Sequence, residues 1–295
     1  MLCGSLRAAA RIIKAYNPDF VVGTGGFAAA PIIIASILKR KKVFLHEQNV
    51  FPGLTNRILA PFAYRVCLSF EGSAGHFLRR SNLVTTGNPR ASEVGCLEKS
   101  KAREILGLDP DLPLLLVVGG SRGAQKLNQS MIEFLINSAE KKEIQVMYIT
   151  GDIYYNEIMT ALQANDLLSK YNNRLHVTPF QPEMPLCMAA ADLIITRAGA
   201  TTLAEITALG LPAIIIPSPN VVHNHQLLNA LELQQKGAAE LIEEKDLHEE
   251  TLQECVYALL GNHGRMSSLK ENSKKIAYPE AAENIYRLMM GETSK

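Results

Sequence analysis

The stretch ADLIITRAGATTLAEITALGLPAIIIP, residues 191–217, decides the fold. Its two ends, ADLIIT and LPAIIIP, are apolar runs without polar alternation, as expected of strands buried in a parallel sheet. Between them, Leu203, Ile206 and Leu209 recur at helical spacing. A strand, a helix and a second strand in this order predict one unit of a doubly wound α/β domain.

The same alternation runs through almost the whole chain. Apolar segments of strand length are separated by helical patterns or polar turns. The expected strands are 19–23, 42–46, 65–70, 83–87, 114–120, 144–150, 175–180, 192–196 and 213–217. The predicted fold class is therefore α/β, with two doubly wound, Rossmann-like parallel sheets.

A rise in polarity before the fifth expected strand divides this series in two. We expect an N-terminal domain over residues 1–90, a linker over 91–112 and a C-terminal domain over 113–278. The last segment, 279–295, is expected to form a helix that returns to the N-terminal domain. An amphipathic helix near 5–16 opens the chain in the middle of the alternating pattern, so we expect the first domain to be incomplete at its N-terminus.

Composition excludes several classes of protein. A chain of 295 residues with 47% hydrophobic and 20% charged residues is typical of folded globular domains. The formal net charge of +1 gives no reason to expect nucleic acid as a partner. The cysteines are scattered and odd in number, which favours a reducing cytoplasm and indicates neither a disulfide framework nor a zinc site. We expect no metal and no cofactor.

Parallel sheets bind their ligands where loops leave the carboxyl ends of the strands. Six such loops in this chain are rich in glycine or polar residues. They are GTGGF at 23–27, HEQNVFPGLTN at 46–56, GGSRGAQ at 119–125, TPFQPEMP at 178–185, RAGATT at 197–202 and PSPNVVHNHQ at 217–226.

The RAGATT loop enters its helix with small residues. A helix N-terminus carries free N–H groups and roughly half a positive charge, so Ala200, Thr201 and Thr202 would let a diphosphate approach closely. Glu205 follows one turn later, where its carboxylate could accept both hydroxyls of a ribose. A tight crossover followed by a helix-solvating glutamate explains the pattern equally well, and the residues alone leave both interpretations open.

Two other loops carry candidate chemistry. GGSRGAQ contains three glycines and Ser121, so its backbone could approach an oxygen-rich ligand, although it lacks the P-loop and dinucleotide fingerprints. HEQN places His46 beside Glu47, a pair that could act as an acid, a base or a hydrogen-bond anchor. The alternatives are a structural turn for the first loop and a polar loop that satisfies its own backbone for the second.

Two apparent metal motifs are weak. His223 and His225 are two residues apart and would point away from each other on a helix. The DPD motif at 109–111 resembles the acidic metal motif of some sugar transferases. It lies between a helix and a proline-flanked strand, however, which favours a turn.

The segment PIIIASILKRKK, residues 31–42, joins an apolar helix to a basic cluster. If exposed, it would suit the surface of an anionic bilayer, where each basic residue adds on the order of 1 kcal/mol. A helix that covers a parallel sheet and ends in cations would show the same pattern.

Taken together, these loops resemble the MurG family, whose members add N-acetylglucosamine to lipid I in peptidoglycan synthesis. The resemblance runs from about residue 7 to residue 290, in the order and approximate spacing of that family. The matching segments are GTGGFAAAP, LHEQNVFPGLTN, TGNPRASEV, VVGGSRGAQKLN, TRAGATTLAEITALGLPAIIIPSP and NHQLLNA. The resemblance implies a metal-independent, inverting glycosyltransferase of the GT-B type, with two domains facing a cleft. Acceptor and membrane functions would lie mainly in the first domain and UDP-sugar binding in the second.

The resemblance also implies roles for single residues. Ala200, Thr201 and Thr202 would meet the diphosphate of UDP-N-acetylglucosamine, and Glu205 would meet its ribose. For the general base, His46 and Glu47 are the plausible residues. Further implied contacts are Ser121 and Arg90 near the diphosphate, Gln181 at the uracil, Asn49, Gln226 and His225 at the sugar, and Arg197 as a support behind them.

The family's first glycine-rich loop, of the GGTGGH type, has no counterpart in this chain, and it carries a histidine proposed to take part in catalysis. We therefore expect either an enzyme, in this form or as part of a longer protein, or a UDP-sugar-binding fragment without transferase activity. A UDP-sugar epimerase is a further alternative, against which HEQN and GNPRASEV count.

The expected partners are UDP-N-acetylglucosamine, lipid I and an anionic membrane surface. The resemblance implies a peripheral protein on the cytoplasmic face of the bacterial plasma membrane, with a role in cell shape and cell division.

Overall fold

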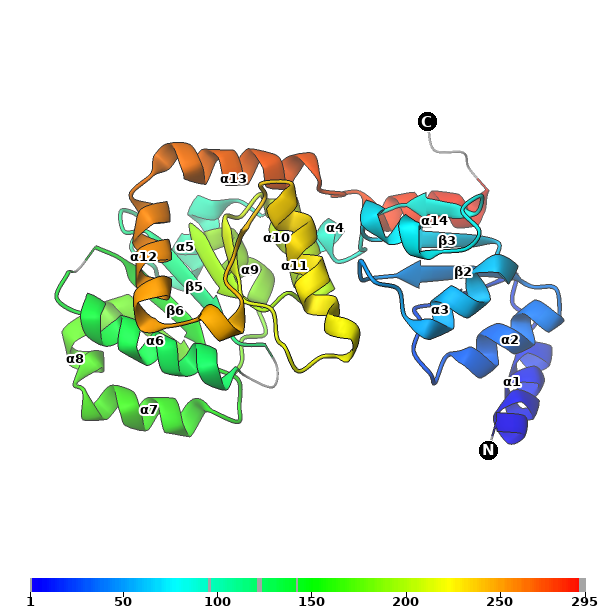
Figure 1. The fold of residues 1–295 in the computed structure, drawn as a ribbon, viewed down its shortest axis with the longest axis horizontal. Coiled ribbons are helices and arrows are strands. Elements are labelled where there is room, and N and C mark those ends of the chain that lie inside the picture. The colour runs from blue at the N-terminus through cyan, green and yellow to red at the C-terminus, as the bar shows by residue number, and fades with distance from the viewer. Residues whose placement is uncertain (1, 95–96, 121–123, 142, 292–295) are drawn as a thin grey trace. The chain divides into compact units, whose positions relative to one another are not determined.

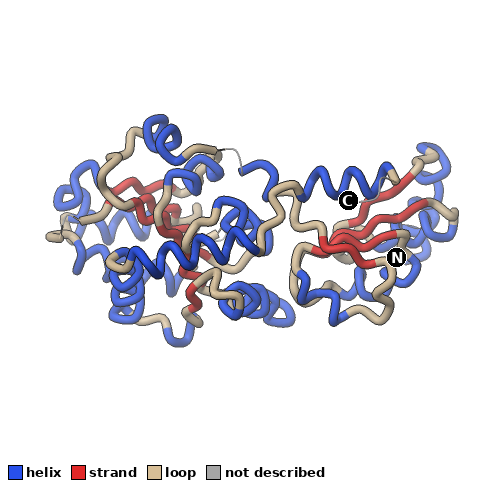
Figure 2. The backbone as a smooth tube through the Cα atoms, turned by 90° about the horizontal axis from the view of Figure 1, so that it is seen from above, coloured by secondary structure: helices blue, strands red, loops and turns tan. Residues whose placement is uncertain are grey.

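The chain divides into two compact units, each built on its own parallel sheet (Figures 1 and 2). The first unit comprises Met1–Ser92 and Tyr278–Lys295, and the second comprises Glu93–Ala277. The segment at the C-terminal end of the chain thus belongs to the first unit. This computed structural model describes residues 2–94, 97–120, 124–141 and 143–291.

The first unit contains a four-stranded sheet of order β1-β2-β3-β4, in which every pair is parallel. The order of the strands across the sheet is therefore the same as their order in the chain. The strands are β1 (Phe20–Gly23), β2 (Lys42–Glu47), β3 (Arg65–Leu68) and β4 (Leu83–Thr85). The helices are α1 (Leu2–Tyr16), α2 (Ala30–Leu38), α3 (Leu54–Leu59), α14 (Ala281–Met290) and the short α4 (Ala91–Val94) at the boundary between the units.

Helix α2 is buried on two sides. Its residue Ala35 packs with Ala9 and Ile13 of α1. Its residue Ile33 belongs to the main core of the unit, together with Leu45 of β2. The apolar character of this helix therefore follows largely from packing.

The second unit contains a six-stranded parallel sheet of order β10-β9-β8-β5-β6-β7. The chain starts at β5, moves outward through β6 to β7, and then returns to the other side of β5. The strands are β5 (Leu114–Val118), β6 (Gln145–Ile149), β7 (Leu175–Thr178), β8 (Leu193–Thr196), β9 (Ala213–Ile215) and β10 (Glu240–Leu241). The helices are α5 (Lys99–Leu106), α6 (Gln125–Ser138), α7 (Tyr155–Ala164), α8 (Leu167–Tyr171), α9 (Met184–Ala190), α10 (Ala200–Leu209), α11 (His225–Gln235), α12 (Glu249–Leu260) and α13 (His263–Lys275).

The direction of winding reverses between β5 and β8, which pair directly. The helices that follow these strands have different neighbours: α6 packs with α7 and α12, whereas α10 packs with α9 and α13. Where two neighbouring strands send their loops to opposite faces, a crevice opens between the loops. The topology therefore predicts a ligand-binding site at this edge of the sheet.

The expected strands are confirmed, most of them with somewhat shorter bounds, while β2 extends one residue further, to Glu47. The sequence pattern missed β10, because a strand of two residues is too short to show a periodicity. The segment that follows β3, Glu71–His76, is a 3-10 helix. The DPD turn is confirmed, since the side chain of Asp109 accepts a hydrogen bond from the backbone of Asp111 at 2.8 Å.

Residues 91–112, which were expected to form a linker, pack largely within the second unit. Helix α5 packs on α9, and the guanidinium of Arg103 donates to the carbonyl oxygen of Ala190 at 3.0 Å. The same arginine forms an ion pair with Asp192, ahead of β8. Polarity suggested a linker because charged side chains make these contacts, but most of the segment belongs to the second unit.

The close packing of Gly87 against the segment before α14 can be tested by mutation. The φ of Gly87 is +81°, and a Cβ at this position would lie 2.2 Å from the Cβ of Tyr278, which precedes α14. Gly26 has a φ of +82° but no described atom within 4 Å of such a Cβ. Both alanine variants would strain the backbone by about 1–2 kcal/mol. We expect Gly87→Ala to lower the free energy of unfolding further than Gly26→Ala does, because Tyr278 must also move. Denaturant titration checks this, and equal losses would contradict the close packing of this segment.

Candidate functional site

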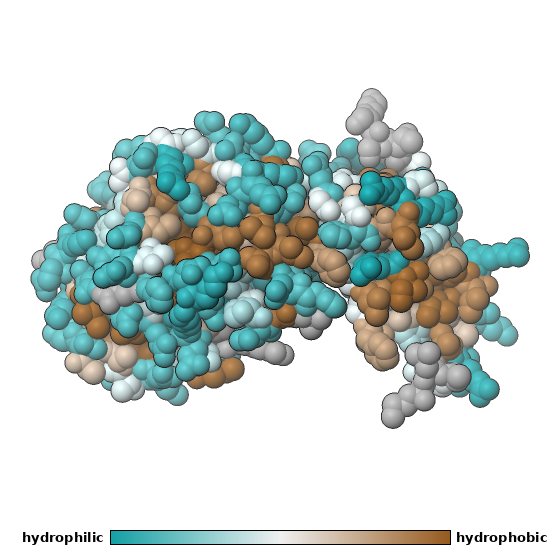
Figure 3. Space-filling view, in the orientation of Figure 1, coloured by the Kyte–Doolittle hydropathy of each residue, from teal (hydrophilic) through white to brown (hydrophobic). Residues whose placement is uncertain are grey.

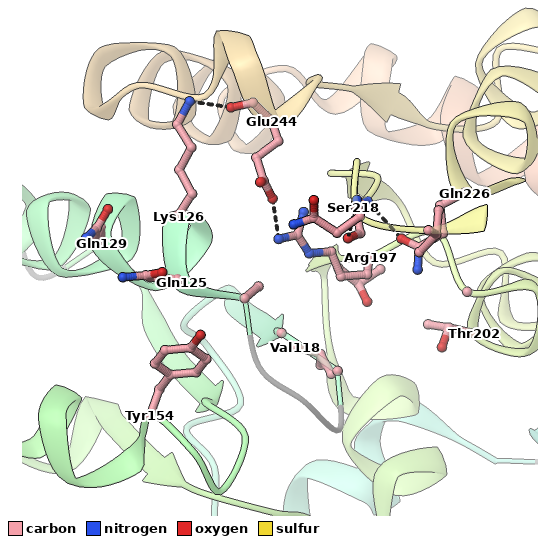
Figure 4. Close-up of a pocket in the computed structure, with 17 residues that line it drawn as sticks. Val118, Gln125, Lys126, Gln129, Tyr154, Arg197, Thr202, Ser218, Gln226 and Glu244 are labelled. Carbon is pink, nitrogen blue, oxygen red and sulfur yellow. Dashed lines mark hydrogen bonds and ion pairs between the residues drawn. The ribbon is translucent and has the colours of Figure 1, made fainter. Parts of the chain in front are cut away.

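A cavity of about 840 Å³ lies at the switch point of the second unit. Its walls come from the loop after β5, the start of α6, the start of α10 and the segment between β9 and α11 (Figure 4). The described lining includes Lys126, Arg197, Thr202, Gln226 and Glu244. Three of the residues singled out in the sequence, Arg197, Thr202 and Gln226, are thus brought together at one cavity.

The start of α10 forms one wall of this cavity. Gly199 is the N-cap residue, and within the described residues no side chain caps it. The N–H groups of the first turn, up to Thr202, have no acceptor inside the helix and are available to an anion. The preceding turn is held in place by the fully buried Asn229 of α11, whose side chain donates to the carbonyl oxygen of Ala198 at 3.3 Å.

Gln226, in the first turn of α11, also lines the cavity. Its side-chain oxygen accepts a hydrogen bond from the backbone N–H of Ser218 at 2.8 Å. The amide nitrogen lies on the side away from Ser218 and remains a donor (Figure 4). The residues before α11, His223 and Asn224, have φ values of 56° and 50°, a left-handed conformation that is uncommon for residues other than glycine.

Arg197 follows β8 directly. Its Nη1 donates to the carbonyl oxygens of Ile216 and Pro217, at 3.1 and 3.4 Å, and its Nη2 forms an ion pair with Glu244. The guanidinium therefore links the ends of two strands to a segment that follows β10.

Several predicted residues of the second unit lie elsewhere or cannot be placed. Glu205 is only 5% exposed, on α10, and is not part of the described lining of the cavity. The side-chain oxygen of Gln181, in the loop after β7, accepts from the backbone of Glu183 at 3.2 Å. Ala200 is buried, Thr201 is half-buried beside it, and His225 begins α11. Ser121 lies outside the described residues.

In the first unit, Glu47 organises the loop that follows β2. Its Oε1 accepts from the backbone N–H of Asn49 at 3.0 Å, and its Oε2 accepts from the N–H of Gly53 at 3.0 Å and from the Asn56 side chain at 2.9 Å. The residue is 3% exposed. A carboxylate with both oxygens bound to groups of its own loop is well suited to holding that loop closed.

His46 is buried beside it. Its Nε2 lies 3.1 Å from the carbonyl oxygen of Gly87, a contact that requires the proton on Nε2. Burial lowers the pKa of His46 below its ordinary value of 6.5, and the hydrogen bond to Gly87 and the nearby Glu47 oppose this only in part. The imidazole is therefore neutral at pH 7, with its lone pair on Nδ1.

Asn49 and Arg90 lie on two loops at the carboxyl edge of the same sheet. The carbonyl oxygen of Asn49 accepts from the hydroxyl of Ser73 at 2.9 Å. The backbone N–H of Arg90 donates to the side chain of Asn88 at 3.1 Å, which forms a tight turn after β4. Both backbones are therefore fixed, and both side chains are partly exposed.

Sequence reasoning missed Lys126 and Glu244, which line the cavity. Glu244 lies in none of the motifs, and Lys126 lies within the matching segment VVGGSRGAQKLN without having been singled out. Across the described residues, no group of three or more His, Cys, Asp or Glu side chains has an arrangement that could hold a metal ion. The described helices include none that is long and apolar enough to cross a membrane.

Comparison with known proteins identifies the family. The glycosyltransferase family 28 C-terminal domain matches residues 114–285, and the N-terminal domain of the same family matches residues 2–68. The UDP-N-acetylglucosamine–N-acetylmuramyl-(pentapeptide) pyrophosphoryl-undecaprenol N-acetylglucosamine transferase of Thermoanaerobacter sp. (strain X514) is 41% identical over 288 residues. That alignment covers 98% of this chain and 78% of the relative. The chain belongs to the MurG family of glycosyltransferases.

Solved structures agree with this assignment. The crystal structure of Acinetobacter baumannii MurG has a TM-score of 0.77 and 28% identity to this chain, covering 97% of it and 77% of the MurG chain. The two parallel-sheet units are thus the two domains of the GT-B fold. A UDP-GlcNAc 2-epimerase from Neisseria meningitidis, bound to UDP-GlcNAc, has a TM-score of 0.73. At 13% identity, over 99% of this chain and 81% of the epimerase, that likeness shows the fold alone.

The Glu47 geometry leads to a prediction that separates a loop-holding role from a catalytic one. In Glu47→Gln, an amide NH2 would face N–H donors from Asn49, Gly53 and Asn56, leaving buried donors unpaired. We expect the free energy of unfolding to fall by about 1–3 kcal/mol. Glu280→Gln, an exposed change of the same charge in the same unit, should have little effect. A Glu47→Gln protein that is as stable as the wild type but turns over slowly would instead support Glu47 as a general base.

Proposed function

We propose that this protein transfers N-acetylglucosamine from UDP-N-acetylglucosamine to the C4 hydroxyl of the muramic acid of lipid I, forming lipid II. The observation that carries the proposal is the cavity at the switch point, formed by the uncapped start of α10 and the amide of Gln226. It lies in a chain of the MurG family, whose named relatives are N-acetylglucosamine transferases. Through peptidoglycan synthesis, the reaction would contribute to cell shape and cell division.

The proposed reaction is a single displacement. The C4 oxygen attacks the anomeric carbon of the donor from the face opposite UDP, and a new glycosidic bond forms as the bond to the diphosphate oxygen breaks. The electron pair of the broken bond leaves with UDP, and the α linkage of the donor becomes a β linkage. The first-turn N–H groups of α10 are fixed before the reaction and would stabilise the charge that grows on the diphosphate.

A general base must receive the proton of the attacking hydroxyl. Of the two residues expected for this role, Glu47 has both oxygens bound to its own loop. His46 is neutral and retains a lone pair on Nδ1. We therefore assign the role of base to His46 and the role of loop support to Glu47.

The purified protein tests the proposal directly. With radiolabelled UDP-N-acetylglucosamine and lipid I in detergent, we expect labelled lipid II and release of UDP. A protein that binds UDP-N-acetylglucosamine but forms no lipid II would be a UDP-sugar-binding protein, and the transferase proposal would then be wrong.

Glu205 supplies the prediction for nucleotide binding. If its carboxylate accepts the ribose hydroxyls, Glu205→Gln should raise the KM for UDP-N-acetylglucosamine about tenfold, since hydrogen bonds to charged groups contribute about 1.5–3 kcal/mol. The 2′-deoxyribose donor should be poorer for the wild type but should lose much less on mutation. Because Glu205 is buried, thermal unfolding of the variant is the control. Equal effects on both donors would place the carboxylate away from the 2′-hydroxyl.

We also propose that the first unit docks on the cytoplasmic face of the plasma membrane. Leu54 and Ile58 of α3, and Phe62 in the turn after it, are spaced by four residues and are 68%, 57% and 65% exposed. Figure 3 shows apolar residues gathered on this unit over α2 and α3. Leu38, the last residue of α2, is also exposed, and the basic cluster at 39–42 follows it. The buried residues of α2, Ile33 and Ala35, do not contribute to this surface, whereas Leu38 at the end of the helix does.

The double variant Ile58→Ser with Phe62→Ser tests this surface. Both side chains are exposed, so the free energy of unfolding should change little. Affinity for vesicles of phosphatidylglycerol and phosphatidylethanolamine should fall about tenfold or more, because the lost burial amounts to more than about 1.4 kcal/mol. Ile153→Ser, at a similarly exposed position in the second unit, is the matched control in vesicle sedimentation. Unchanged sedimentation of the double variant would exclude this surface as the docking site.

A further inference from the structure

Glu244 lines the cavity of the second unit although it lies in no recognisable motif. It begins a single 3-10 turn, Glu244–Asp246, between β10 and α12. Two side chains hold it from different directions (Figure 4). The ammonium of Lys126, at the start of α6, donates to its main-chain oxygen, and Arg197 forms an ion pair with its carboxylate.

Arg197 connects Glu244 to the segment that follows β9. Besides its ion pair with Glu244, it donates to the carbonyl oxygens of Ile216 and Pro217, where the chain leaves β9. The next residue, Ser218, donates its N–H to the side-chain oxygen of Gln226 at 2.8 Å. A continuous series of polar contacts therefore runs from Glu244 through Arg197 and the segment 216–218 to Gln226.

We propose that Glu244 is a positioning residue for the sugar of the donor. By holding Arg197, it fixes the segment 216–218, and that segment in turn fixes the rotamer in which Gln226 presents its amide nitrogen to the cavity. The side chain of Arg197 is 13% exposed and that of Glu244 is 18% exposed. Poor access to water makes the position of each charge depend strongly on the other. The inference rests on the proposed function, because it takes a UDP-sugar as the ligand.

In a Glu244 variant, the loss of the negative charge and the loss of the positioning role should have opposite effects on ligand binding. A carboxylate beside a site for a diphosphate repels the ligand. Removing its charge should by itself strengthen alike the binding of UDP-N-acetylglucosamine and of the methyl ester of UDP, which carries the same diphosphate charge but no sugar. Loss of positioning at Gln226 should weaken only the ligand that carries the sugar. The ratio of the two dissociation constants, UDP-N-acetylglucosamine over the methyl ester of UDP, cancels the charge effect and reports the positioning.

Calorimetric titration of Glu244→Gln with the two ligands tests the proposal. We expect this ratio to rise about three- to tenfold, the range of typical coupling between residues in one polar network. Arg197→Lys keeps the charge but cannot make both sets of contacts, and it should raise the ratio in the same way. Glu243→Gln is the matched control: its carboxylate pairs with the exposed Lys245 at 3.2 Å, outside the described cavity lining, and the ratio should stay at the wild-type value.

Repeating the titration in a Gln226→Ala variant separates the positioning of Gln226 by Glu244 from a general loss of structure. In Gln226→Ala, the Glu244→Gln substitution should have little further effect on the ratio, because the group that it positions is gone. An unchanged ratio in Glu244→Gln, or the same rise in the Gln226→Ala background, would overturn the inference. A wild-type protein that binds neither ligand would overturn the proposed function itself, and that result is distinguishable because it appears before any substitution.

Discussion

The parallel pairing of β5 with β8 is the constraint on which the second domain depends. These strands are consecutive neighbours in space but are separated in the chain by two other strands, and their pairing places Val118 opposite Thr196. The loops after these two residues therefore leave the sheet side by side and diverge toward opposite faces. Residues 114–117 and 193–195 are completely buried. Both faces of these strands are packed, so a register shift of one residue would exchange side chains of different shape between the two faces of the core and would also misalign the two loops. Core packing and cavity geometry are therefore fixed by one interaction.

The sequence was sufficient to predict every described strand except β10, the doubly wound class of both sheets and the start of α10, because these features follow from local patterns. Apolar runs identify buried strands, and small residues at a strand-to-helix turn identify a helix end that a ligand can approach. The part played by Glu47 was not predictable in the same way. HEQN shows a carboxylate beside an imidazole, but the partners that occupy it include Gly53 and Asn56, further along the loop. Only the closed loop shows that the carboxylate faces the chain's own N–H groups.

Lys126 and Glu244 were missed for a related physical reason. Glu244 lies in no motif. Lys126 lies within VVGGSRGAQKLN, but its spacing does not distinguish it from a solvated charge at the start of a helix. Their contact joins residues more than a hundred positions apart, and it depends on where the segment after β10 crosses the start of α6. Glu205, in contrast, was singled out in the sequence, but its burial was not predicted. Its spacing correctly placed it within the helix, but spacing cannot show that its side chain is buried.

The charges around the cavity also bear on turnover. Arg197 and Lys126 are both cationic, but Glu244 opposes the charge of Arg197, and the ammonium of Lys126 is directed at main-chain oxygen. A site with two unopposed cations would bind UDP tightly both before and after the reaction, which would lower KM without raising the rate and would slow product release. Fixed N–H groups at the start of α10 offer a more selective contribution, because their effect grows with the charge that develops on the departing oxygen. The opposed cations are therefore better suited to holding the cavity in shape, and the helix start to stabilising the leaving group.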